Sequence, residues 1–439
     1  MRSAWRLCIV VIALFSAMPA KGDGPERDPF GPLHIFEPVG EMRGLVVLYS
    51  DAGGWDRDAA TAATALARKG SLVVGVDLAQ YRHRIDQNAR RCAALVGDAE
   101  ATSRDLQRAR NYRDYHSPIL AGIRVGGTLA GMILKSAPPA TLAGAVSLDP
   151  GPVDDALCGT ARADDGSKTL PGFWTIGLSA RNSASTVQIE ATDKSADVQH
   201  IPAKTSPAVA LVDLISHHLD FSAPLTGVAK LPLIELPAPH QSPLLAIIIS
   251  GDGGWRDLDK VIAEDLSRNA VPVVGWDSLR YFWSRRTPEE ASRDLAAVIE
   301  TYTRKWRAQK VALIGYSFGA DVLPFLYDRL PSETKRRVSQ ISLLGLSGAA
   351  DFEIKVSGWL GGSHSEASQP TQPALAPIDP ALIQCFYGEK ESDTLCPALA
   401  SRGAETVRTA GGHHFDGDYA ALARHIRAGF NARARQGSH

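Results

Sequence analysis

The chain has almost no net charge and no hydrophobic run long enough to cross a membrane. Its 47 Lys and Arg nearly balance its 48 Asp and Glu, and the formal net charge is -1. This balance argues against broad electrostatic capture of nucleic acid, so we expect no nucleic-acid partner. With 44% hydrophobic and 22% charged residues over 439 positions, the composition is that of a globular protein with room for two domains.

The N-terminus has the features of an export signal. Arg2 and Arg6 precede a short apolar run over residues 7–15, and the small residues Ala20 and Gly22 follow it. The run is too short to span a bilayer comfortably, which favours a cleaved signal over a retained anchor. We therefore expect a signal peptide over residues 1–22.

Cysteine is scarce, and none of it has the spacing of a metal site. Four cysteines follow the signal: Cys92, Cys158, Cys385 and Cys396. No cysteine and histidine cluster suggests a metal, and no cofactor is expected. In an oxidising compartment the four residues allow three disulfide pairings, of which Cys385 with Cys396 is preferred because the two bracket a short acidic turn. Buried free cysteines are the alternative.

An internal repeat organises the chain. Residues 44–55 resemble residues 245–255, and the offset of 200 that relates Gly53 to Gly253 also carries residues 74–77 onto 274–277. Two blocks in one register indicate a duplicated unit. Residues 217–220 are weakly similar to residues 413–416, which places the end of the first copy near residue 222.

Each copy is predicted to be an α/β domain. Short apolar runs alternate with helical patterns, which implies a mostly parallel sheet flanked by helices. The predicted organisation is a first domain over 33–222, a proline-rich interdomain linker over 223–243 and a second domain over 244–432. Ligands of such sheets bind at the carboxyl ends of the strands.

The second copy contains a candidate nucleophile, Ser317. The stretch Gly315-Tyr316-Ser317-Phe318-Gly319 lies between an apolar run and a helical pattern, as in the nucleophile elbow of α/β-hydrolases. Glycines two residues before and after the serine let strand and helix pass closely. Pro324 lies within the predicted helix and should bend it.

The first copy has Arg124 at the position of the nucleophile. A guanidinium cannot act as a nucleophile, so this copy is predicted to be a degenerate α/β-hydrolase-like domain. A binding or regulatory role and a decayed copy retained for packing are equally compatible with the sequence.

The remaining members of a serine triad should follow in the order acid, then histidine. Asp393, in the acidic turn after the apolar run 382–387, is the preferred acid, and Glu391 is its competitor. His414, after two glycines in a late loop, is the preferred base, with His413 as the alternative.

Two backbone N–H groups are predicted to form the oxyanion hole. One belongs to Phe318, directly after the nucleophile, and the other to Asp252 in the glycine-rich loop 250–255. Asp252, Gly253 and Trp255 of this loop are also the candidate substrate-binding residues. The Asp252 carboxylate would attract a cationic substrate group, unless it serves only a hydrogen bond within the loop.

With these residues in place, the chain resembles the VirJ/AcvB family of periplasmic bacterial virulence proteins. The resemblance is carried by residues 250–255, 315–325, 385–396 and 412–415, and the two-copy layout resembles the longer, AcvB-type members. Pro324 fits the family pattern.

The resemblance implies an α/β-hydrolase in the periplasm that cleaves the ester between lysine and the head group of lysyl-phosphatidylglycerol. It implies Ser317 as nucleophile, His414 or His413 as base and Asp393 as acid. Its expected partner is an aminoacylated phospholipid at the membrane surface, with contact to secretion components also open. The alternatives are a general carboxylesterase and a non-catalytic periplasmic adaptor that assists type IV secretion.

Overall fold

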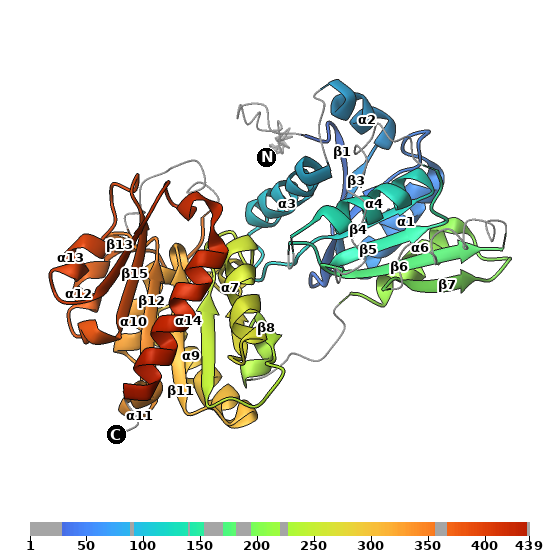
Figure 1. The fold of residues 1–439 in the computed structure, drawn as a ribbon. Helices are drawn as coiled ribbons and strands as arrows, with labels where there is room; N and C mark the ends of the chain where they lie inside the picture. The colour runs from blue at the N-terminus through green and yellow to red at the C-terminus, as the bar shows by residue number, and fades with distance from the viewer. Residues whose placement is uncertain are drawn as a thin grey trace, which may run out of the picture.

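The computed structural model describes residues 29–87, 92–138, 141–152, 170–180, 195–219, 227–355 and 367–436. Two α/β domains lie side by side, the first blue to green and the second yellow to red in Figure 1. The predicted signal peptide and Cys158 lie outside the described residues. Within these ranges, no helix is both long and apolar enough to cross a membrane.

The first domain is a seven-stranded sheet in the order β1-β3-β2-β4-β5-β6-β7. β1 is antiparallel to β3, and all other pairs are parallel. The strands are β1 (Leu33–Phe36), β2 (Gly44–Tyr49), β3 (Ser71–Val76), β4 (Ile119–Ile123), β5 (Gly144–Leu148), β6 (Phe173–Ser179) and β7 (Asp197–Ile201).

The second domain repeats this arrangement strand for strand, in the order β8-β10-β9-β11-β12-β15-β16. Again only the first strand is antiparallel to its neighbour. The strands are β8 (Leu233–Leu236), β9 (Leu244–Ile249), β10 (Val273–Trp276), β11 (Lys310–Tyr316), β12 (Val338–Leu344), β15 (Ile383–Gly388) and β16 (Glu405–Thr409); a separate two-stranded sheet joins β13 (Ala349–Ala350) and β14 (Gln369–Pro370). The identical topology confirms the predicted fold class of tandem α/β-hydrolase-like domains.

Helices cover both faces of each sheet, because the central strands are buried on both sides. α1 and α6 pack on one face of the first sheet and α3 and α4 on the other, and the second domain pairs α7 with α14 and α9 with α10 in the same way. The first domain has α1 (Arg57–Arg68), α2 (Leu78–Gln87), α3 (Cys92–Ala109), α4 (Val125–Ser136) and α6 (Pro207–Ser216). The second has η2 (Gly227–Lys230), α7 (Asp257–Arg268), α8 (Ser278–Tyr281), α9 (Pro288–Trp306), α10 (Phe318–Asp328), α11 (Ser332–Arg337), α12 (Thr371–Leu375), η4 (Pro380–Leu382), α13 (Cys396–Ala400), η5 (Phe415–Gly417) and α14 (Tyr419–Gln436).

The repeated tryptophans explain the repeated glycines. A Cβ at Gly75 would lie 2.3 Å from the Trp55 ring, and one at Gly275 would lie 2.4 Å from the Trp255 ring. Each indole therefore rests on the bare backbone of the neighbouring strand, where no larger residue fits. This packing accounts for the repeat of Trp55 and Gly75 as Trp255 and Gly275.

The predicted boundary between the domains is wrong in one respect. β8 and η2 both fall within the proposed linker 223–243, and β8 is the antiparallel edge strand of the second sheet. Pro232 and Pro237 flank this strand, and an edge strand tolerates prolines that a central strand would not. The proline-rich segment is therefore part of the second domain from residue 227 onward.

The histidine similarity that places the end of the first copy near residue 222 has no counterpart in the topology. His217 and His218 follow α6, the counterpart of α14, whereas His413 and His414 precede α14. The similarity between these histidine pairs is therefore not a topological match. His218 stacks on Phe173 and hydrogen-bonds the Thr175 hydroxyl at 2.9 Å.

The disulfide between Cys385 and Cys396 is present, with Cα atoms 5.5 Å apart and both residues fully buried. It ties β15 to the start of α13, across the acidic turn at residues 388–395. The preferred pairing from the sequence is thus confirmed.

Candidate active site

Ser317 occupies a strained turn between β11 and α10. Its backbone has φ 52° and ψ -118°, a region that side-chain-bearing residues rarely adopt. A Cβ at Gly315 would lie 2.5 Å from the Gly319 carbonyl oxygen, and one at Gly319 would lie 2.1 Å from the Ile249 carbonyl oxygen. Strand, turn and helix thus have the geometry of a nucleophile elbow, and Pro324 lies within α10 without ending it.

A continuous chain of hydrogen bonds runs from Ser317 through His413 to Glu391. The Ser317 Oγ lies 2.7 Å from His413 Nε2, and His413 Nδ1 lies 2.6 Å from Glu391 Oε1. The second carboxylate oxygen of Glu391 accepts the Gly388 backbone N–H at 2.6 Å. This is the geometry of a nucleophile, a base and a carboxylate that orients the base.

Two preferred residues from the sequence are therefore replaced by their competitors. His414 points its Nδ1 at the Tyr316 hydroxyl, 3.1 Å away, and Asp393 is exposed. Glu391 directly closes the turn after β15, where its backbone N–H bonds the Gly388 carbonyl, and this turn aims its side chain back at the sheet edge. Asp393 lies two residues further along the same turn, and among the described residues it is Glu391 that hydrogen-bonds His413.

Gly345 holds the base in place, although the sequence offered no motif to identify it. It follows β12 with φ +66°, and a Cβ there would lie 2.6 Å from His413 Cε1 and 3.5 Å from Glu391 Oε1. The imidazole therefore lies against a bare backbone. The Tyr316 ring stacks on His413 from another side, with centroids 5.5 Å apart.

The hydrogen bond between Glu391 and His413 shifts both pKa values in the direction that favours an ionised carboxylate and a protonated imidazole. It raises the pKa of His413 above 6.5, against the opposing effect of burial. Burial tends to raise the pKa of Glu391, but the bonds from His413 and from the Gly388 N–H outweigh it and lower that pKa. The Glu391 side chain is only 8% exposed, and its lowered pKa favours the ionised carboxylate in this enclosed position beneath the base.

The loop 250–255 lies beside the nucleophile, as an oxyanion hole requires. A Cβ at Gly251 would lie 3.6 Å from the Ser317 Cβ. Among the described residues, neither the Asp252 N–H nor the Phe318 N–H donates to a protein acceptor. Both predicted donors are thus available to a developing oxyanion: the Phe318 N–H follows the serine directly, and the Asp252 N–H follows Gly251, which lies beside the serine.

Two of the predicted substrate-binding residues have structural contacts instead. Trp255 is 3% exposed and packs against Gly275 in the core. The Gly253 carbonyl accepts a hydrogen bond from Arg256 Nε at 2.7 Å. Only Asp252, which is partly exposed, keeps a side chain at the site, and its charge is among those that raise the pKa of His413.

A second carboxyl group, Asp321, lies one helical turn after the nucleophile. Its Oδ1 accepts the Ser347 N–H at 2.7 Å, which joins α10 to the loop after β12. Burial raises the pKa of Asp321 to about 7. Glu391, Asp321 and Asp252 all contribute to raising the pKa of His413, so the surroundings of the base are acidic.

The first domain retains the elbow without its chemistry. Arg124 has φ 49° and ψ -115°, close to the values of Ser317, and its guanidinium pairs with the Asp51 carboxylate at 2.9 Å. The other oxygen of Asp51 accepts the Val125 N–H, the counterpart of the Phe318 N–H, at 3.4 Å. An internal carboxylate therefore lies where a substrate oxyanion would bind in an active copy.

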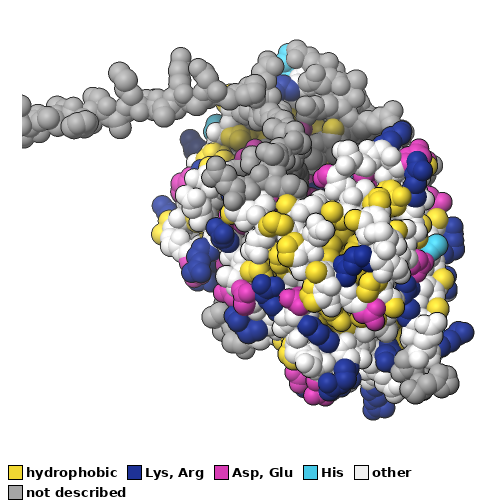
Figure 2. Space-filling view, turned by 90° about the vertical axis from the view of Figure 1, so that its left-hand side faces the viewer, with side chains coloured by type: hydrophobic (Ala, Val, Ile, Leu, Met, Phe, Trp, Pro, Cys, Tyr) yellow, Lys and Arg dark blue, Asp and Glu magenta, His cyan; other side chains and the backbone are white. Residues whose placement is uncertain are grey.

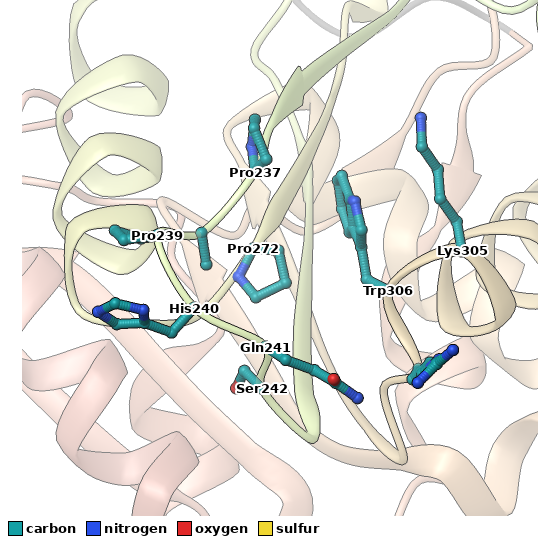
Figure 3. A pocket seen from close by; sticks show the side chains of 10 residues that line it. Pro237, Pro239, His240, Gln241, Ser242, Pro272, Lys305 and Trp306 are labelled. Atoms are coloured by element: carbon teal, nitrogen blue, oxygen red, sulfur yellow. The ribbon is translucent and has the colours of Figure 1, made fainter.

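A pocket with a volume of about 260 Å³ lies away from these residues (Figure 3). It is lined by residues 237–242, Pro272 and residues 305–307, before the amino ends of β9 and β10. The carboxyl ends of the strands, where Ser317 lies, are at the opposite edge of the sheet. Within the described ranges, no group of three or more metal-ligating side chains occurs.

The fold and the hydrogen-bonded Ser317, His413 and Glu391 define an α/β-hydrolase domain with a serine-hydrolase arrangement. Residues 243–434 match the family model described as bacterial virulence protein (VirJ). This match, which covers less than half of the chain, agrees with the resemblance to the VirJ family in the second domain. No curated protein matches the chain.

The chain is also similar to solved structures, at low identity and with low TM-scores. The ferulic-acid-bound Est1E of Butyrivibrio proteoclasticus is 10% identical, with a TM-score of 0.34, and covers 47% of this chain and 96% of its own. The protein Atu2452 of unknown function from Agrobacterium tumefaciens is 18% identical, with a TM-score of 0.32, and covers 46% and 99%. XC6422 of Xanthomonas campestris, a serine hydrolase without a lid, is 17% identical, with a TM-score of 0.30, and covers 46% and 87%.

Proposed function

We propose that the protein is a periplasmic serine esterase that hydrolyses the aminoacyl ester of lysyl-phosphatidylglycerol. The observation that carries the catalytic part is the bond chain from Ser317 Oγ through His413 to Glu391, at 2.7 and 2.6 Å. The substrate class comes from the resemblance to AcvB-type proteins and is supported by the acidic surroundings of the nucleophile.

The reaction proceeds in two balanced steps. Ser317 Oγ attacks the lysyl carbonyl while His413 Nε2 takes its proton, and the Phe318 and Asp252 N–H groups bind the oxyanion. His413 then protonates the departing glycerol oxygen, which releases phosphatidylglycerol and leaves a lysyl ester on Ser317. Water, deprotonated by His413, cleaves this ester and releases lysine. Glu391 keeps the imidazole in the required tautomer throughout.

An aminoacyl ester places a cation close to the reacting carbonyl. From standard bond lengths, its α-ammonium nitrogen lies about 2.5 Å from the carbonyl carbon. A carboxylate near the oxyanion would slow hydrolysis of an ordinary ester, because it repels the developing negative charge. The same carboxylate attracts the ammonium group of an aminoacyl ester, and Asp252 is such a group. The partly exposed Asp252 is therefore the proposed contact for the substrate ammonium.

The proposed location is the outer face of the inner membrane, reached through the predicted signal peptide. On the face of the second domain seen in Figure 2, the described residues intersperse Lys and Arg with Asp and Glu, and no broad region of one charge is visible among them. Binding of the lipid would then depend on the aminoacyl head group at the site rather than on a general attraction to anionic lipid.

The test is release of free lysine from lysyl-phosphatidylglycerol in micelles by the mature protein and by its Ser317→Ala variant. Release by the parent alone supports the proposal. If both folded proteins release nothing while the parent cleaves amine-free esters, a general carboxylesterase replaces it. If neither acts on any ester and Ser317→Ala complements a secretion defect, the protein is an adaptor.

A separate variant addresses the cation. Asp252→Asn keeps the backbone donor but removes the charge, so we expect a higher KM for the aminoacyl lipid and little change on an amine-free ester. Equal activity of parent and variant on both substrates would remove Asp252 from substrate recognition.

A further inference from the structure

The degenerate first domain touches the back of the oxyanion loop of the second. Glu100 lies on α3, which reaches toward α7 of the second domain in Figure 1. Its carboxylate forms an ion pair with Arg256, the residue that precedes α7. The same guanidinium donates its Nε–H to the Gly253 carbonyl at 2.7 Å. Three groups therefore connect the first domain directly to the loop that contains Asp252.

This connection is enclosed. The Glu100 side chain is 8% exposed and also pairs with Arg104 on its own helix, one turn away. A small cavity behind the loop is lined from the first domain by Glu100 and Tyr115 and from the second by residues 253–255 and Asp277. Water screens an ion pair poorly where one partner is this enclosed, so loss of the carboxylate would take this partner from the buried Arg104 and leave it close to the partly exposed Arg256.

Further contacts fix the position of α3 relative to the second domain. The Arg108 guanidinium lies 3.6 Å from the centroid of the Trp283 ring, and the Trp283 indole N–H donates to the Tyr112 carbonyl at 3.0 Å. Tyr115 packs in the core of the second domain and contacts the Trp283 ring, with centroids 4.9 Å apart. Because these contacts fix α3, Glu100 is a stationary support for Arg256 rather than a mobile surface charge.

We propose that the first domain is an intramolecular positioning element for catalysis, and that Glu100 and Arg256 hold the loop 250–255 in the geometry that presents the Asp252 N–H to the oxyanion. Glu100 and Arg256 are positioning residues, since they reach the reacting atoms only through the loop backbone. The inference rests on the proposed serine-esterase function for its kinetic consequence, but the coupling itself is a property of the loop.

The experiment uses the full chain with Glu100→Ala, Glu100→Gln, Arg256→Ala and the double variant Glu100→Ala/Arg256→Ala. Glu37→Ala is the matched control, because Glu37 pairs with Arg110 on the surface of the first domain. In the Glu100 and Arg256 variants we expect kcat to fall about tenfold and KM to stay within about threefold of the parent value. This loss is smaller than the 10²–10³-fold fall in kcat that removal of an oxyanion donor causes. The double variant should match Arg256→Ala, because Glu100 acts through Arg256.

Hydrogen exchange of the peptide over residues 250–256 separates this inference from the proposed function. Faster exchange there in Glu100→Ala, but not in Glu37→Ala, is the expected result whether or not the parent hydrolyses the lipid. An inactive parent with this exchange pattern would refute the esterase and leave the coupling standing. Unchanged exchange in Glu100→Ala would overturn the positioning role. So would faster exchange in folded Glu100→Ala and Glu100→Gln if the parent is active and both variants keep its kcat.

Discussion

Replacement of Glu391 by Gln tests the carboxylate beneath His413 with almost no change of shape. In the parent, one oxygen of Glu391 accepts from His413 and the other accepts from the Gly388 N–H. A glutamine has one acceptor and one donor, so it cannot serve both partners. If its oxygen stays with Gly388, its NH₂ faces His413 and forces the imidazole into the tautomer that cannot accept the serine proton.

The opposite amide orientation is also costly. It restores the bond to His413 but places the NH₂ group against the Gly388 N–H, which leaves that backbone donor unpaired. An unpaired buried donor costs about 1–3 kcal/mol, so the unproductive orientation should dominate. In a Ser-His-Asp triad the corresponding change lowers kcat about 10⁴-fold. Because the His413 side chain is 43% exposed and water can assist it, we expect a loss of about 10³-fold here.

The pH dependence gives an independent readout. Catalysis needs neutral His413, so kcat/KM should rise with pH as His413 loses its proton, with a midpoint above 6.5 in the parent because Glu391 raises that pKa. Glu391→Gln removes the largest of the interactions that raise it, and the midpoint should move to lower pH.

The assay is the initial rate of lysine release, and of p-nitrophenyl ester cleavage, from pH 5 to 9. Asp393→Asn is the matched control, since Asp393 is exposed in the same turn, and should stay within about twofold of the parent. A large loss in Asp393→Asn together with near-parental activity in Glu391→Gln would refute the assignment of the acid.

Three further outcomes follow from the structure. Gly345→Ala should displace His413 and lower kcat at least about 10²-fold, since misplacement of a catalytic group by about 1 Å has that effect. The control Gly348→Ala, whose new Cβ has nothing within 4 Å, should have near-parental activity in the same ester assay. Replacement of Cys385 and Cys396 by serine should lower the free energy of unfolding by about 3 kcal/mol in urea titrations, and an unchanged midpoint would show that the bridge does not stabilise the fold. Arg124→Ser in a chain without the natural nucleophile should restore no hydrolysis, because a carboxylate rather than an imidazole lies beside that position; measurable turnover would contradict this.

The sequence predicted the features that depend on local pattern. The glycines around Ser317 and the preceding apolar run are sufficient to identify an elbow, and the structure has one. The choice between neighbouring candidates was beyond the sequence, because His413 and His414 share the same glycine-preceded loop. Which of the two faces Ser317 depends on the backbone path of this loop, which turns tightly at residues 415–417, where Phe415 and Asp416 have positive φ.

Contacts between residues far apart in the chain could not be predicted from the sequence either. Gly345 supports the base through a position after β12 that no motif marks, and Arg256 appeared in the sequence only as a residue after the loop. The Pro-rich segment was misassigned for a different reason: proline density indicates extended chain, but β8 is extended chain that also pairs with β10. Composition does not distinguish a free linker from an edge strand.

The retained elbow in the first domain shows that packing, not chemistry, maintains this strained turn. A residue in such a region costs on the order of 1–3 kcal/mol, and Arg124 gains nothing catalytic in return. The turn persists because a Cβ at Gly126 would lie 2.3 Å from the Ser50 carbonyl oxygen, so helix and strand cross as closely as in the second domain. The Arg124 N–H also bonds the Leu148 carbonyl, as the Ser317 N–H bonds that of Leu344. The side chain at the turn was therefore replaceable without loss of the fold, and what the first domain still contributes to the reaction passes through α3 instead.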